Sequence, residues 1–270
     1  QAPQFWDELF TLSPKLTSLD AASNVRRSAV ALGEYRNVTN AKDILSSLML
    51  QAGENFSVFD AEGVLTSVFG ENQGNPSSPA ESALRFYTEF SNPAKSVYSW
   101  NRALPQSRSA FAAGDLGVYF GFASEYSGLL AAYPHLQVRV ATLPQVKGGK
   151  KVLTFGRMQA LAIPNGALNP QGALIIAQKF ASQAGGEAVA AALGLPPVQR
   201  ALLSSVAQDD AVKDVFYDSS IMAAAWLDPA PFESSRLFQE MIESVTSGRA
   251  SLTDAIGQAG SEMSRLYSGE

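Results

Sequence analysis

Aromatic and amide side chains occur together at predicted turns and strand ends of this 270-residue sequence. The segment SVYSWNRALP, residues 96–105, alternates so that Val97 lies on one side and Tyr98 and Trp100 lie on the other. Asn101 follows with a side-chain amide. Two interpretations are open for this segment. It is either a core anchor beneath a loop or a flat amphipathic face that packs against a ligand.

The same combination of residue types recurs along the chain and favours a binding cleft for a neutral polyol. Aromatic rings pack against the apolar C–H faces of sugar rings, whereas Asn, Arg and Asp side chains hydrogen-bond hydroxyl groups. In open α/β sheets, ligands bind at the carboxyl ends of the strands. The residues of this kind at predicted strand ends or loops include Tyr35, Tyr98, Trp100, Asn101, Tyr119, Phe155 and Arg157.

Several kinds of chemistry are excluded by composition and motif. The chain contains no cysteine, which excludes disulfides, thiolate metal sites and a cysteine nucleophile. Its one histidine, His135, follows Pro134 at a predicted helix end, a context that indicates a turn residue and suits neither a zinc site nor a catalytic triad. No G-x-S-x-G, Walker or G-x-G-x-x-G pattern occurs. We therefore expect no cofactor and no metal.

Paired carboxylates are the remaining candidates for catalysis. Asp209 with Asp210, and Glu240 with Glu243, lie in polar or helix-surface contexts that solvated faces explain. Glu125 follows the aromatic segment VYFGFAS, but one acid does not make an acid–base pair. We expect no enzyme activity.

The composition indicates a globular protein. Apolar residues make up 46% of the chain and charged residues 17%. A net charge of −5 gives no reason to expect nucleic acid or an anionic membrane as partner. No apolar run approaches the ~20 residues that span a bilayer, and residues 1–10 lack the features of a signal peptide.

Predicted strands and helices alternate in the first half, which favours α/β layers. We predict a helix that begins near residue 3 and is bent or broken at Pro14. The other predicted elements up to residue 164 are a strand at 28–33, a helix at 40–53 capped by Asn40, a hairpin at 56–69, a turn at 70–79, a helix at 80–90, a helix at 107–115, a strand at 116–122, a helix at 124–134, a strand at 136–144 and a strand-like segment at 151–164. Later residues read as helical, including 199–208 and two long C-terminal helices, the first bounded by Pro231 and Gly248.

The order and spacing of several stretches resemble the extracellular solute-binding proteins of ABC importers, in the carbohydrate-binding group typified by maltose-binding protein. The stretches are PQFWDELF, ALGEYRNVTNAKDILSSLMLQAG, FYTEFSNPAKSVYSWN, AFAAGDLGVYFG, LTFGRMQALAIPNGALNPQGALIIAQKF, LGLPPVQRALL and MIESVTSGRASLTDAIGQA. Phe5 replaces the usual threonine before Trp6, and Asp115 and Val118 replace lysine and methionine in the Gly114 motif. The resemblance implies an α/β fold of the periplasmic binding protein type.

The resemblance also implies a lobe organisation. Residues 1–158 would form the first part of the C-terminal lobe, and 159–216 a hinge crossing with helices of the N-terminal lobe. Residues 217–270 would form the hinge return and the last helices of the C-terminal lobe. Hinge strands are expected near 159–164 and 207–217. Because the family begins with an α/β lobe of roughly 100 residues, the resemblance implies that this lobe is lost, cleaved or supplied by a separate chain.

The function implied by the resemblance is that of a substrate-binding component of an ABC transporter. Such a protein binds a sugar or oligosaccharide between two lobes and delivers it to permease subunits in the membrane. Its location would be extracytoplasmic, with anchoring through an N-terminal region outside this sequence. The expected ligand-binding residues are Tyr35, Tyr98, Trp100, Asn101, Tyr119, Glu125, Phe155, Arg157 and Trp226.

Two alternatives from other functional classes stay open. One is an interaction or scaffold module that keeps the lobe without transport. The other is a glycoside-active enzyme that uses Glu125 with a second acid.

Overall fold

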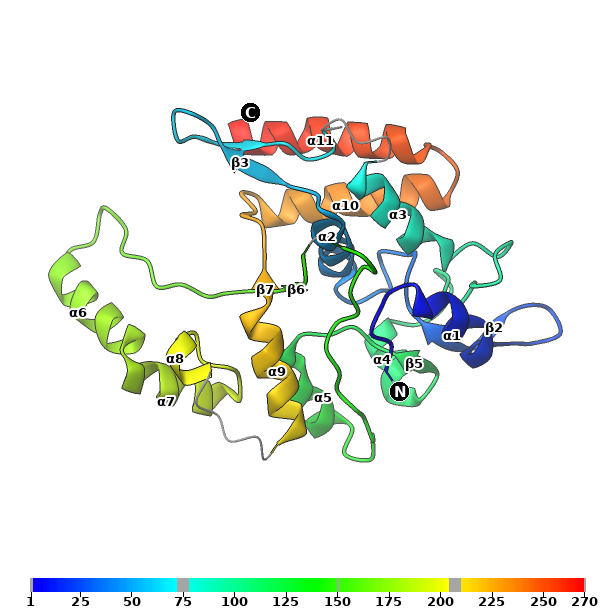
Figure 1. The fold of residues 1–270 in the computed structure, drawn as a ribbon, viewed down its shortest axis with the longest axis horizontal. Coiled ribbons are helices and arrows are strands. Elements are labelled where there is room, and N and C mark those ends of the chain that lie inside the picture. The colour runs from blue at the N-terminus through cyan, green and yellow to red at the C-terminus, as the bar shows by residue number, and fades with distance from the viewer. Residues whose placement is uncertain (1, 72–77, 150, 204–209, 270) are drawn as a thin grey trace. The chain divides into compact units, whose positions relative to one another are not determined.

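The computed structural model describes residues 2–71, 78–149, 151–203 and 210–269 (Figure 1). The chain forms two compact units. Unit 1 comprises Gln1–Gly121, Leu143–Phe155 and Ala225–Glu270, and unit 2 comprises Phe122–Thr142 and Gly156–Ala224. Divisions were expected after residues 158 and 216, whereas the units divide after 155 and 224 and place 122–142 in unit 2.

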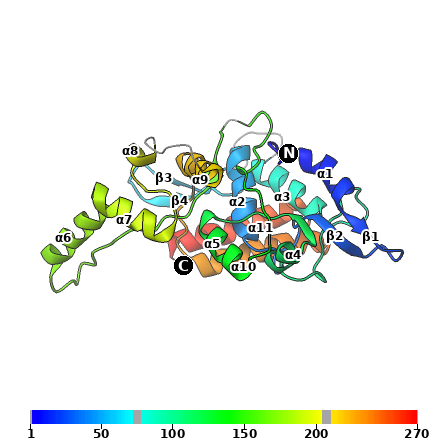
Figure 2. The same cartoon turned by 90° about the horizontal axis from the view of Figure 1, so that it is seen from below.

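Unit 1 is an α/β unit. Its elements in chain order are α1 (Glu8–Leu16), β1 (Ser18–Leu19), β2 (Val25–Val30), α2 (Ala41–Ala52), β3 (Ser57–Phe59), β4 (Leu65–Ser67), α3 (Pro79–Glu89), α4 (Ser107–Ala113), β5 (Leu116–Val118), β6 (Thr154–Phe155), α10 (Pro231–Thr246) and α11 (Leu252–Ser268). Helices α10 and α11 run alongside each other (Figure 2).

The central sheet of unit 1 has the strand order β1-β2-β5. β2 pairs antiparallel with β1 and parallel with β5, where Ser28 is opposite Leu116 and Val30 is opposite Val118. Because β2 and β5 are parallel, the loops that follow them leave the sheet at the same edge.

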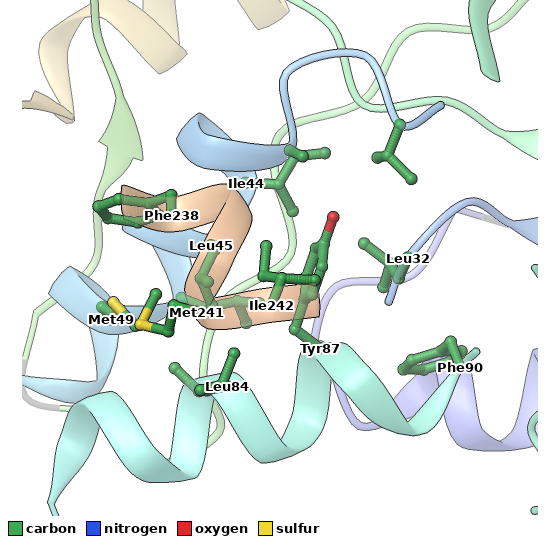
Figure 3. Close-up of a cluster of buried hydrophobic side chains, with 14 of the residues drawn as sticks. Leu32, Ile44, Leu45, Met49, Leu84, Tyr87, Phe90, Phe238, Met241 and Ile242 are labelled. Atoms are coloured by element: carbon green, nitrogen blue, oxygen red, sulfur yellow. The ribbon is translucent and has the colours of Figure 1, made fainter. Parts of the chain in front are cut away.

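The core of unit 1 joins helices that are far apart in sequence. Leu45 and Met49 of α2 pack with Leu84 of α3 and with Phe238 and Ile242 of α10 (Figure 3). Each of these side chains is buried. The apolar stripe of α2 ends at Gly53, whose φ of 100° is a left-handed conformation that glycine adopts without strain. Helix α10, near the end of the chain, therefore packs into the same core as helices α2 and α3 from its first third.

Unit 2 is mainly helical. It contains α5 (Ala123–Ala132), α6 (Pro170–Ala181), α7 (Gln183–Leu193), α8 (Arg200–Leu203), α9 (Ala211–Ile221) and β7 (Ala223–Ala224). The rings of Tyr126 and Phe216 meet edge to face at 5.7 Å and join α5 to α9. Helix α6 buries none of its residues. In the part of the chain that the structure describes, no helix combines the length and apolar character needed to cross a membrane.

The structure confirms several predicted elements and corrects others. The helix at 40–53, the hairpin at 56–69 and the two C-terminal helices are present. The strand predicted at 28–33 occupies Val25–Val30 instead, and the strand-like segment at 151–164 reduces to Thr154–Phe155. No strand forms at 136–144, which alternates apolar and polar residues without a neighbouring strand to pair with.

Two further corrections concern caps and hinges. Asn40 has a left-handed φ of 62° and makes no side-chain cap to α2. Hinge strands were predicted at 159–164 and 207–217, but the described residues of these segments, 159–164 and 210–217, contain no strand. The first segment is irregular, and α9 occupies 211–217, with Asp210 accepting from Val212 N at 3.0 Å. Residues 72–77 of the predicted turn, 204–208 of the predicted helix, and Asp209 lie outside the described residues.

A buried amide, Gln51, anchors the segment that returns to unit 1 at Leu143. Its oxygen accepts from Trp6 Nε1 at 2.8 Å and from Val146 N at 3.0 Å. Its nitrogen donates to Pro144 O at 3.1 Å and to Leu153 O at 2.8 Å. The side chain has 0% exposure, so these partners hold the turn before α1, helix α2 and the 143–155 segment together without help from solvent.

Replacing Gln51 with leucine should destabilise the protein strongly. The substitution leaves two buried donors and two buried acceptors without this partner, so the free energy of unfolding should fall by about 3 kcal/mol or more. Urea unfolding measures the change. The control is Gln258→Leu on the exposed face of α11, where the expected change is within about 0.5 kcal/mol. Equal stability of the two variants would contradict this role of Gln51.

Candidate functional site

Tyr35 and Tyr119 lie at the edge of the central sheet where β2 and β5 end. Tyr35 is in the loop after β2 and Tyr119 directly follows β5. Both are partly buried and pack against the core of unit 1. The ring of Tyr119 stacks on that of Phe111 from α4, with centroids 5.5 Å apart. The parallel pairing of β2 and β5 thus brings two of the predicted aromatic residues to one edge.

The loop between β2 and α2 is held in one conformation by buried contacts. Gly33 has a φ of 91°, and a Cβ atom there would lie 2.6 Å from the Ser91 side chain. The Tyr87 hydroxyl donates to Glu34 O at 2.8 Å. Asn37 is buried, and its amide nitrogen donates to Asn101 O at 2.8 Å. Tyr35 is therefore presented from a backbone that is fixed on both sides.

Trp100 is a core residue, which corrects the prediction that it stacks on a ligand. Its side chain is 1% exposed, and its Nε1 donates to Asn37 Oδ1 at 3.1 Å. A ring without an accessible face cannot pack on a sugar, so the core-anchor interpretation of the 96–105 segment holds. Beside it, the Asn101 amide donates to the Tyr98 hydroxyl at 2.6 Å, and its oxygen accepts from Ala103 N at 2.9 Å.

Trp226 ends an aromatic stack in unit 1. Its ring lies 4.7 Å from that of Phe56 with 13° between the planes, and its Nε1 donates to Ser46 Oγ at 3.3 Å. Lys42 Nζ lies 5.1 Å from the centre of the Trp226 ring. Lys42 in turn pairs with Asp228 at 2.5 Å. Trp226 is half-buried, and these contacts fix the orientation of its ring.

The N-terminal part of α10 adds two residues that the sequence analysis did not identify. Phe232 is 80% exposed. Ser235 lies close enough to the hydroxyl of Tyr35 to influence its pKa, so α10 meets the loop that follows β2. Burial raises the pKa of Tyr35, and the Ser235 side chain opposes the rise. The sequence signal that could have pointed to this part of α10 is a phenylalanine directly after Pro231, at a predicted helix start.

We define the aromatic edge of unit 1 as Tyr35, Tyr119, Trp226, Phe232 and Ser235. The proximity of Ser235 to the Tyr35 hydroxyl places the loop after β2 beside α10. Trp226 lies five residues before the start of α10 at Pro231. These residues carry four aromatic rings and three hydroxyl groups, the groups that offer apolar faces and hydrogen bonds to a ligand.

Phe155, the last residue of its segment in unit 1, is half-buried and lies two residues after Leu153, which Gln51 holds. Glu125 and Arg157 belong to unit 2. The Glu125 carboxylate accepts from Phe122 N at 3.0 Å and so stabilises the start of α5. The Arg157 guanidinium lies 4.3 Å from the centre of the Phe122 ring. The structure thus brings Glu125 and Arg157 to the same aromatic residue.

The two residues next to Tyr35 in sequence, Glu34 and Arg36, each form an ion pair. Arg36 Nε contacts Glu243 at 2.8 Å, and Arg102 Nε contacts Glu34 at 3.3 Å. Burial raises the pKa of the Glu34 carboxyl, with Arg102 acting in the opposite direction. Burial also acts to raise the pKa of Glu243, but hydrogen bonds from Arg36 and Gln239 outweigh it and lower that pKa.

The described residues contain no group of three or more His, Asp or Glu side chains that could hold a metal ion. His135 is exposed, as expected of a turn residue. What the aromatic edge offers is therefore stacking and hydrogen bonding.

Comparison with solved structures identifies the fold. A cyclo/maltodextrin-binding protein complexed with maltotetraose matches 97% of this chain with a TM-score of 0.71 at 16% identity. The cyclic α-maltosyl-1,6-maltose binding protein from Arthrobacter globiformis matches 100% of it, with a TM-score of 0.68 at 17% identity. An ABC transporter solute-binding protein from Thermotoga lettingae bound with α-D-tagatose matches 99%, with a TM-score of 0.64 at 18% identity.

The chain has the fold of ABC-transporter solute-binding proteins. This confirms the α/β fold of the periplasmic binding protein type that the sequence stretches predicted. The chain spans 64%, 66% and 65% of the length of these three structures. All three are described as binding proteins. No protein-family model matches the sequence, and a search of curated proteins gives no match.

The buried carboxyl of Glu34 should make stability depend on pH. Because its folded-state pKa is raised, its contribution to stability is complete below the unfolded pKa and is lost as pH rises through the folded pKa. Unfolding in urea from about pH 4 to about pH 7 should show the wild type losing stability relative to Glu34→Gln. The control is Glu62→Gln on the exposed turn between β3 and β4. Parallel profiles for the wild type and Glu34→Gln would contradict the assignment.

Proposed function

We propose that the chain is the sugar-binding part of a solute-binding protein of an ABC importer. The observation that carries the proposal is the likeness of nearly the whole chain to solved binding proteins whose ligands are a tagatose, a maltotetraose and a cyclic maltosyl-maltose. The ligand class is accordingly a neutral sugar or oligosaccharide. The chemistry of the aromatic edge supports the same class, because exposed rings beside hydroxyl groups suit polyols.

In the proposed site, the aromatic edge of unit 1 makes the main contacts. Phe232 offers an exposed ring, and Trp226 offers the part of its ring that its stack on Phe56 leaves accessible. The Tyr35 hydroxyl and Ser235 form a polar pair that can exchange hydrogen bonds with sugar hydroxyls. Tyr119 adds a second tyrosine at the same sheet edge.

The other predicted ligand-binding residues lie outside the aromatic edge. Phe155 and Arg157 flank the passage from unit 1 to unit 2, and Glu125 lies at the start of α5. Each stays a predicted ligand contact. Tyr98 and Asn101 hydrogen-bond each other, so a ligand would have to compete for their polar groups. Trp100 is left out because it is buried.

The proposed protein performs no reaction. Its structural neighbours are binding proteins, and the Glu125 carboxylate stabilises a helix start. A glycosidase would need a second acid placed opposite Glu125, and a scaffold module would bind no sugar. Neither alternative explains the aromatic edge as well as sugar binding does.

The proposed partners follow from the same fold. An importer of this kind delivers its ligand to permease subunits at the membrane, and the binding protein would act outside the cytoplasm. Each of the three neighbours has about a third of its length without a counterpart in these 270 residues. We propose that this part, an N-terminal lobe, completes the clamp on the ligand. Helix α6 carries exposed Leu174, Ile175 and Ile176, a surface suited to such packing.

Titration calorimetry with maltotriose, maltotetraose and tagatose tests the proposal. We expect weak but measurable binding of at least one sugar by the 270-residue chain, since a clamp with fewer contacts binds more weakly. Tyr35→Ala and Phe232→Ala should each weaken binding by about tenfold, or about 1.4 kcal/mol.

The matched control is Tyr133→Ala, which removes a 41% exposed tyrosine from unit 2 and should leave the affinity unchanged. Circular dichroism of every variant checks the fold. If all three sugars give no heat, or if the two edge variants bind like the wild type, the aromatic edge is not a sugar site.

A further inference from the structure

A turn in unit 2 contains Asn165 followed by Gly166, the only Asn-Gly pair in the 270 residues. Pro164 O accepts from Ala167 N at 3.0 Å, so Asn165 and Gly166 are the two central residues of the turn. Both are exposed. In the described part of the chain, no hydrogen bond engages the Asn165 side chain or the Gly166 N–H.

Glycine leaves its own backbone nitrogen unusually accessible. A Cβ built at Gly166 would have no atom within 4 Å, so the turn is open to solvent on that side. Because glycine has no side chain, little hinders the approach of its backbone nitrogen to the preceding side chain. An unrestrained asparagine beside such a nitrogen is the arrangement in which this residue type is chemically labile.

We propose that Asn165 is a site of spontaneous modification by its own backbone. The nitrogen of Gly166 attacks the side-chain carbonyl carbon of Asn165. A bond forms between these two atoms, the bond from that carbon to Nδ2 breaks, and ammonia leaves with the proton lost from Gly166. The product is a five-membered imide ring that includes the backbone between the two residues.

Water then opens the ring at either of its two carbonyl carbons. Opening at the side-chain carbonyl gives aspartate in the normal backbone. Opening at the backbone carbonyl gives isoaspartate, in which the chain runs through the side chain and gains a methylene group. In either case a neutral amide becomes a carboxylate, in the segment that leads from Gly156 of unit 2 to α6.

Asn169 provides an internal comparison only four residues away. Its Oδ1 accepts from Gly172 N at 2.9 Å and caps α6. The next residue is Pro170, which has no N–H proton to lose. The same segment therefore contains one asparagine that meets the chemical requirements of ring closure and one that does not.

The test is peptide mapping after incubation of the purified 270-residue protein in mildly alkaline and mildly acidic buffers. Trypsin cleaves after Arg157 and Lys179, so one peptide, 158–179, contains both asparagines. Fragment-ion sequencing then assigns any change to one residue, and a zero-time sample corrects for change during digestion. We expect acid to accumulate at Asn165 as two separable isomers of equal mass, faster in alkaline buffer, with Asn169 intact.

Gly166→Ala is the matched variant. The added Cβ meets nothing within 4 Å, and no left-handed φ is recorded at this position, so the fold should be unaffected. The methyl group hinders the attacking nitrogen, and the rate at Asn165 should fall by about an order of magnitude. Accumulation at an equal rate in this variant, equal modification of Asn169, or an Asn165 that stays amidated in alkaline buffer would each overturn the proposal.

Discussion

A buried side-chain amide must hydrogen-bond through both its oxygen and its nitrogen, and two such amides hold separate segments of unit 1 together. Asn37 binds Trp100 Nε1 through its oxygen and Asn101 O through its nitrogen. The loop between β2 and α2 is thereby fixed to the 100–104 segment. Gln51 does the same for the 143–155 segment. The loop that presents Tyr35 is thus held by the buried bonds of Asn37.

Aromatic stacking positions Trp226 in the aromatic edge. Trp226 is stacked on Phe56, which in turn stacks on Phe69 with ring centroids 5.0 Å apart. The ring of Phe238 lies 6.2 Å from that of Phe56 and links the stack to α10. Such packing presents Trp226 from a close-packed core.

How much the sequence could predict depends on whether the signal was local. The helix at 40–53 and the hairpin at 56–69 were predictable because their apolar periodicity and turn residues lie within the element. A hinge strand was expected where α9 lies, although Asp210, which caps α9, is a residue type that favours a helix start. The alternation around Trp100 predicted that it faces away from Val97, but the segment forms no strand and both side chains are buried in the core of unit 1. Ser235 was missed because its partner, Tyr35, is 200 residues away in sequence.

The fold and the ligand class therefore rest on different grounds. The fold follows from structural likeness over the whole chain, whereas sugar binding depends on whether the aromatic edge contacts a ligand. The most direct measurement is amide chemical-shift mapping of the isotope-labelled protein with maltotriose, maltotetraose and tagatose added in turn. The account predicts that at least one sugar shifts amides of residues 33–37 and 226–235 most strongly. Unchanged spectra with all three, or shifts confined to the groove that Glu240 and Gln258 line between α10 and α11, would contradict it.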